Sequence, residues 1–256
     1  MKFFLRHLFP ISYFQATRLN RWALVGYNGL VEWIPALALA LFYNDFQVSV
    51  IQVVLLSYLG FICIYEIGYI TNDFLSERFE AEPRGRSSNF PDETIWIWLL
   101  VIARIAIFLI ITAFLEVLDS SLWWGFHLGL AVTFGMHNAF PSAWRVPTFF
   151  ALSTFRYLAP IILVIDPNVL VVLLPAVLIN NSLYRTTVYV KNKSTSPVHD
   201  GVGQKFAFYL ASLPLSIVFA IQSRSILPLI VCVYYMVIWT CFWTVSRAFG
   251  WELGRE

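Results

Sequence analysis

The chain has 256 residues, of which 59% are hydrophobic and 12% are charged, and its mean hydropathy is +0.71. A soluble core cannot absorb this much apolar surface, whereas repeated apolar stretches of about 20 residues are typical of a polytopic helical membrane protein. The net charge of +2 argues against the clustered basic surface of a nucleic-acid-binding protein. We therefore expect a lipid bilayer around the protein and no nucleic acid.

In chain order, the first 21 residues mix basic and aromatic side chains. They predict an amphipathic cytoplasmic segment at the membrane surface, because no continuous apolar stretch of a cleaved signal peptide is present. Residues 22–256 then form a single predicted transmembrane domain, an all-α bundle of about eight helices. The expected spans are 22–42, 47–70, 95–115, 121–139, 146–165, 168–190, 206–222 and 226–247.

Lysine and arginine residues between these spans orient the bundle. Almost all of them fall on the side of the N-terminus, and Arg224 alone falls on the other side. The positive-inside rule then predicts both termini in the cytoplasm of a bacterial inner (plasma) membrane. The two polar loops, after spans two and six, are four helices apart, which predicts two pseudo-repeated halves around a cavity open to the cytoplasmic face.

Acidic residues gather where the second span ends. If that helix continues past Tyr69, the spacing of four acids places them on one face, with Asn72 beside them. These acids are Glu66, Asp73, Glu77 and Glu80. One or two carboxylates together with phosphate oxygens suit Mg²⁺, so Asp73 with Glu77 or Glu80 is the predicted metal site. A solvated loop with weak surface ion pairs is the alternative interpretation.

Basic residues on the same side can bind phosphate, arginine through paired hydrogen bonds and lysine as a point charge. The candidates are Arg84, Arg86, Arg145, Arg185, Lys191 and Lys193. Arg185 lies inside a span, where an arginine is costly and usually faces a cavity, and Tyr189 follows it on the same polar stripe. Arg145 could instead be a simple membrane anchor. Arg104 and Arg156 also lie inside spans and could pair with Glu32 or Glu116.

The segment from Asn72 to Arg86 resembles the first motif of the UbiA superfamily of intramembrane prenyltransferases, Asn-Asp-x-x-Asp-x-x-x-Asp followed by proline and arginine. Asn72 and Asp73 match its opening pair, Ser76 replaces the second acid and Glu80 stands at the third. Pro83, Arg84 and Arg86 match the trailing element, and Phe140-Pro141 followed by Arg145 is similar to a second family element. The second loop departs from the family pattern, because it offers Asp200 and lysines where two or more acids are usual.

The resemblance implies a Mg²⁺-dependent transferase that uses a phosphate-bearing donor and an isoprenoid lipid. The implied catalytic residues are Asn72, Asp73, Glu77 and Glu80, with Glu66 and Tyr69 as substrate contacts. The lysines of the second loop favour phosphoribosyl transfer from phosphoribosyl diphosphate to a polyprenyl phosphate, for cell-envelope glycan synthesis. Prenyl transfer to an aromatic acceptor, and transport or flipping of a lipid-linked anion, are the alternatives. The oligomeric state is left open.

Overall fold

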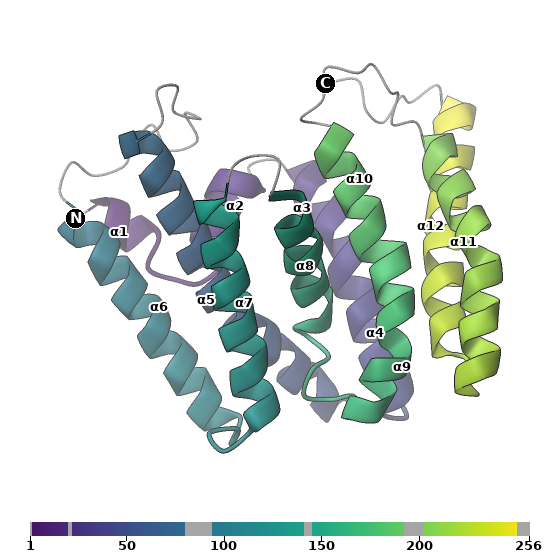
Figure 1. The fold of residues 1–256 in the computed structure, drawn as a ribbon, viewed down its shortest axis with the longest axis horizontal. Helices are drawn as coiled ribbons and strands as arrows, with labels where there is room; N and C mark the ends of the chain where they lie inside the picture. The colour runs from purple at the N-terminus through teal and green to yellow at the C-terminus, as the bar shows by residue number, and fades with distance from the viewer. Residues whose placement is uncertain (1, 20–21, 80–93, 141–144, 192–201, 250–256) are drawn as a thin grey trace.

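Every regular element of the computed structural model is helical within the residues that it describes, which are 2–19, 22–79, 94–140, 145–191 and 202–249 (Figure 1). This confirms the predicted all-α class. Six helices in these ranges are long and apolar enough to cross a membrane, which indicates an integral membrane protein. They are Leu24–Tyr43, Ser49–Leu75, Ile95–Phe114, Pro167–Val190, Lys205–Ser223 and Leu227–Val245.

The N-terminal segment forms two short helices, α1 (Lys2–Arg6) and α2 (Ser12–Arg18). Leu5 and Phe9 are exposed, as expected for a segment at the membrane surface. Tyr13 and Phe14, however, are 0% and 1% exposed, so one face of the segment is packed inside the bundle. The segment is therefore part of the core as well as amphipathic.

The first span is a composite of α3 (Trp22–Asn28), the π-helix η1 (Gly29–Trp33) and α4 (Ile34–Tyr43). It is followed by α5 (Ser49–Phe79), α6 (Ile95–Phe114) and α7 (Ser121–Ala139). Helix α5 continues nine residues beyond the predicted end at residue 70, which meets the condition for its acidic face. Gly68 lets α7 approach α5 closely, because a Cβ atom at this position would overlap the ring of Phe134.

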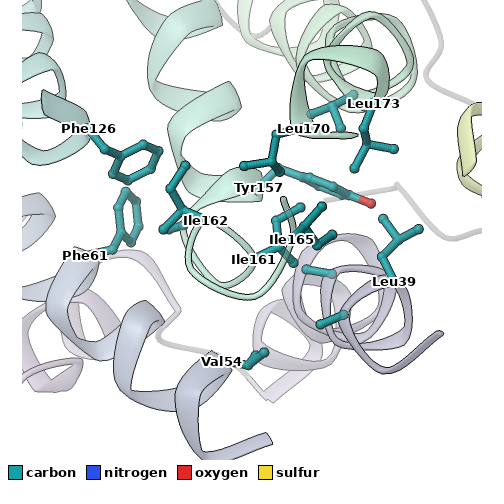
Figure 2. Close-up of a cluster of buried hydrophobic side chains, with 14 of the residues drawn as sticks. Leu39, Val54, Phe61, Phe126, Tyr157, Ile161, Ile162, Ile165, Leu170 and Leu173 are labelled. Atoms are coloured by element: carbon teal, nitrogen blue, oxygen red, sulfur yellow. The ribbon is translucent and has the colours of Figure 1, made fainter. Parts of the chain in front are cut away.

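Helix α8 (Arg145–Leu158) is shorter than the predicted span 146–165. Its 14 residues extend about 21 Å, less than the roughly 30 Å of hydrocarbon that a span must cross. The chain then turns inside the protein, where Ile161, Ile162 and Ile165 pack among Tyr157, Leu39, Leu170 and Leu173, while Phe61 and Phe126 lie next to each other (Figure 2). These apolar side chains are buried in the protein core rather than in lipid. Helices α7 and α8 are not among the six candidate spans found in the described residues, so the structure supports six spans and does not confirm the predicted eight.

The chain continues through α9 (Pro167–Val177), the π-helix η3 (Leu178–Leu183) and α10 (Tyr184–Lys191), and ends with the antiparallel pair α11 (Val202–Ser223) and α12 (Leu227–Phe249). In Figure 1 the α1 helix, the end of α5, the end of α10 and the start of α11 all lie at one end of the bundle. The turns after α4, α6 and α11 lie at the opposite end. Helix ends that flank both polar loops thus share one end of the bundle.

Candidate functional site

Asp73 lies at the end of the bundle where the sequence predicts a catalytic carboxylate. Its side chain is buried and accepts hydrogen bonds from Arg18 Nη2 at 2.7 and 3.0 Å and from the Tyr13 hydroxyl at 2.9 Å. Asn72 Nδ2 donates a longer bond of 3.3 Å to the same carboxylate. Burial and the neighbouring Asp73 raise the pKa of Tyr13, so its hydroxyl stays a donor. We call Tyr13, Arg18, Asn72 and Asp73 the mouth group.

Glu66 lies on the same face of α5, but its carboxylate is bonded to other residues of the protein. Its carboxylate binds Arg104 Nε at 2.7 Å, with both side chains 0% exposed, and accepts the backbone N–H of Phe14 at 2.7 Å. The Arg104 guanidinium also donates to the carbonyl oxygens of His7 at 2.6 Å, Phe9 at 2.9 Å and Leu8. This pair therefore fixes the N-terminal segment in place. Arg104 was expected to pair with Glu32 or Glu116, and the structure gives it Glu66.

A second buried group joins three separate segments. Glu32 of η1 forms ion pairs with Arg156 of α8, at 2.6 Å, and with Arg185 of α10. Arg156 also donates to the side-chain oxygen of Asn28. The pairing of Arg156 with Glu32 was one of the predicted alternatives, and it is confirmed. We call Glu32, Arg156 and Arg185 the deep group, which carries one more positive than negative charge.

Aromatic rings connect the two groups. The Arg18 guanidinium carbon lies 4.3 Å from the centre of the Tyr69 ring, and that ring stacks on Phe14 at 5.8 Å with an angle of 8°. The guanidinium carbon of Arg156 lies 4.8 Å from the centre of the Phe14 ring. Such contacts stabilise cations on aromatic faces. A continuous path of cations and rings thus runs from Asp73 to Glu32 between the helices.

The remaining predicted residues fall in different places. Arg145 donates from Nε to the Phe140 carbonyl at 2.9 Å, a contact that joins the start of α8 to the residue that follows α7. Tyr189 stacks on Phe149 with ring centres 4.1 Å apart, so the polar stripe of α10 faces α8. Glu80, Arg84, Arg86 and Lys193 lie outside the described residues, as do the side chains of Glu77 and Lys191.

The described residues do not by themselves fit Mg²⁺. They contain no group of three His, Cys, Asp or Glu side chains that could hold a metal ion. In these ranges the carboxylate of Asp73 is held by Arg18 and Tyr13, donors that compete with a metal for its oxygens. A magnesium site would need this contact to open and Glu77 or Glu80 to contribute.

Sequence reasoning missed the importance of Tyr13, Phe14 and Arg18. These residues were assigned to a surface segment, yet they contact Asp73, Glu66 and Tyr69. One signal was available, since a basic residue and two aromatic residues just before the first span can fold back on an acidic helix face.

No family model, no curated protein and no solved structure matches the chain.

Proposed function

We propose that this chain is an intramembrane transferase of the UbiA type that acts on an isoprenoid lipid and a diphosphate-activated donor. Its membrane domain would comprise eight segments in two halves, with both termini and the site facing the cytoplasm. The observation that carries the proposal is the path from Asp73 to Glu32, in which charged side chains from four helical segments, α2, α5, α8 and η1, meet between aromatic rings.

The mouth group suits the diphosphate end of a donor. Arg18 is a guanidinium that can exchange a carboxylate for a phosphate, because both accept its hydrogen bonds in the same geometry. In the described structure its partner is Asp73. Cationic donors on the departing pyrophosphate stabilise the charge that develops there, which is the main catalytic effect expected of such a site.

The preferred reaction is phosphoribosyl transfer to a polyprenyl phosphate. An oxygen of the lipid phosphate forms a bond to the anomeric carbon of the ribose, while the bond from that carbon to pyrophosphate breaks and pyrophosphate leaves with the electron pair. No general base is needed because the phosphate nucleophile is already ionised. The net positive charge of the deep group supports a phosphate-bearing acceptor over a neutral aromatic one.

The variant Asp73→Asn tests the enzyme class. Purified full-length protein is assayed with phosphoribosyl diphosphate plus a polyprenyl phosphate, and separately with a prenyl diphosphate plus an aromatic acid, each with and without Mg²⁺. We expect product in the first assay and a loss of about a hundredfold or more in the variant, because the lost carboxylate no longer positions the Arg18 guanidinium that stabilises the leaving pyrophosphate. Asp119→Asn, an exposed aspartate at the other end of the bundle, is the matched control.

Product only in the second assay would assign the chain to prenyl transfer. Absence of product in both, together with movement of a lipid-linked anion across vesicles, would establish a transporter instead. Wild-type turnover by Asp73→Asn would reject the role of the mouth group.

Cysteine labelling tests the proposed orientation. Single cysteines at Ser87 and Ser194 should react with a membrane-impermeant reagent from the cytoplasmic side, and one at Ser121 from the opposite side. The exposed Cys241 must first be replaced, whereas Cys63 and Cys232 are buried. Labelling of Ser87 and Ser194 positions from opposite sides would contradict a shared site.

A further inference from the structure

A cavity of about 430 Å³ lies between the two short N-terminal helices and the start of the first span. Its described lining comes from α1 and the residue after it, from α2 and from α3. The cavity is therefore at the end of the bundle that carries α1 and the end of α5 (Figure 1). Its volume falls within the roughly 300–1,000 Å³ of sites for small ligands. The mouth group is not part of the described lining, so the cavity is a separate feature.

Hydrogen-bond donors form one part of the lining. Arg6, the last residue of α1, is exposed and forms no ion pair with the residues that the structure describes. Gln15 of α2 adds an exposed side-chain amide. Glu66 and Asp73, the acids that contact the N-terminal segment, each have an arginine partner already. The described lining thus holds one full positive charge and no acid, which favours an anionic ligand.

His7 brings a buried polar atom to the same cavity. It is 5% exposed, and its ring packs edge-on against Phe3 and Tyr13. The ring also interacts with the backbone of Ser12, but its Nδ1 reaches no partner in hydrogen-bond geometry within the described part of the chain. A buried polar atom without a partner costs free energy. A ligand in the cavity that His7 borders can pair with this atom, since a neutral imidazole both donates and accepts.

Apolar residues form another part of the described lining, Ala16 and Leu19 from α2 and Trp22 and Val25 from α3. Trp22 is 83% exposed and lies two residues before the first candidate span. Tryptophan is enriched at this depth, where lipid headgroups meet the acyl chains. A ligand that joins an anionic head to apolar chains therefore matches both parts of the lining.

We propose that this cavity binds the headgroup phosphate of an anionic membrane phospholipid such as phosphatidylglycerol, with Arg6 and Gln15 on the phosphate oxygens. A phosphodiester carries one negative charge, which the single cation of the described lining neutralises. The bound lipid joins α1, α2 and α3. Because α2 also brings Arg18 to Asp73, a ligand that needs the docked segment stabilises this contact.

The test measures equilibrium binding of radiolabelled dioctanoyl phosphatidylglycerol to the full-length protein in an uncharged detergent. Arg6→Gln should weaken binding about tenfold or more, since it removes a charge-assisted hydrogen bond. Ala16→Trp fills the cavity without a change of charge and should weaken binding at least as much. Both side chains are exposed, so folding should survive. Arg224→Gln, at the opposite end of the bundle, and Ala131→Trp, at an exposed position of α7, are the matched controls and should bind as the wild type does.

Competition identifies what the cavity recognises. Dioctanoyl phosphatidylcholine has the same chains but no net charge, so it should compete poorly. Glycerol 3-phosphate should compete only at much higher concentration, because it lacks the chains. Equal competition by phosphatidylcholine would overturn the choice of an anionic lipid. Equal competition by glycerol 3-phosphate would make this a site for free phosphate esters and overturn the lipid assignment.

Hydrogen exchange locates the bound lipid. At a free concentration of about a hundred times Kd, phosphatidylglycerol should slow the exchange of residues 2–19 about a hundredfold, because the cavity exists only while this segment is docked. The same concentration should leave exchange unchanged in Ala16→Trp. Lipid binding to the wild type without slower exchange of residues 2–19, or wild-type affinity in both Arg6→Gln and Ala16→Trp, would overturn the site.

Discussion

The variant Arg104→Met tests whether Glu66 holds the N-terminal segment or contacts a substrate. The Arg104 guanidinium binds Glu66 Oε2 at 2.7 Å and the carbonyl oxygens of three consecutive residues that follow α1. Both charged side chains are 0% exposed. Removing one partner of such a pair costs about 3–5 kcal/mol, because the other charge stays buried without compensation. We expect about 4 kcal/mol, which raises the population of the undocked segment roughly a thousandfold.

Hydrogen exchange followed by mass spectrometry measures this opening directly, in peptides that cover residues 2–19. The double variant Glu66→Leu with Arg104→Met removes both charges and should be more protected than the sum of the single variants predicts, by about 2 kcal/mol. Additive losses, or a loss below about 1 kcal/mol in Arg104→Met, would refute the ion-pair argument. If Glu66→Gln leaves the hydrogen-exchange protection of residues 2–19 unchanged and raises the KM for the substrate, Glu66 has the substrate-binding role that the sequence predicts.

Two further predictions concern packing and pH. Gly68→Ala should destabilise the bundle by about 1–3 kcal/mol in an unfolding measurement, because the new Cβ overlaps Phe134, whereas Gly125→Ala, with nothing within 4 Å, should cost nothing. Burial, with the nearby charge of Arg6, lowers the pKa of His7 from its ordinary value of 6.5. The folded state then binds this proton less well than the unfolded state, so docking of the N-terminal segment weakens as pH falls below 6.5. Limited proteolysis should cut the segment faster at about pH 5.5 than at about pH 7.5, and a flat response, or one that persists in His7→Gln, would contradict this.

The sequence by itself determined the class of the protein and the register of its acidic face. Long apolar stretches must be helical in lipid, since only a helix satisfies its own backbone there. The helical period then places Glu66 and Asp73 on one side of α5, which the structure confirms by extending that helix to Phe79. Alternation of spans and turns also placed the helix ends that flank both polar loops at one end of the bundle.

The tertiary structure decided the partners of the buried charges. A buried charge must be compensated, but sequence says only that a partner exists and not which one it is. Asp73 pairs with Arg18, 55 positions away, and Glu66 pairs with Arg104, 38 positions away. The pair of Asp73 with Arg18 forms because the N-terminal segment folds into the bundle. The amphipathic pattern of that segment equally fits a segment that lies on the membrane surface.

The same limit explains the fifth predicted span. Ile161, Ile162 and Ile165 read as membrane-facing residues because hydropathy measures only the preference for leaving water. Lipid and protein core satisfy that preference equally well. Only the packing of the surrounding helices places these side chains inside the protein and ends α8 at Leu158 (Figure 2).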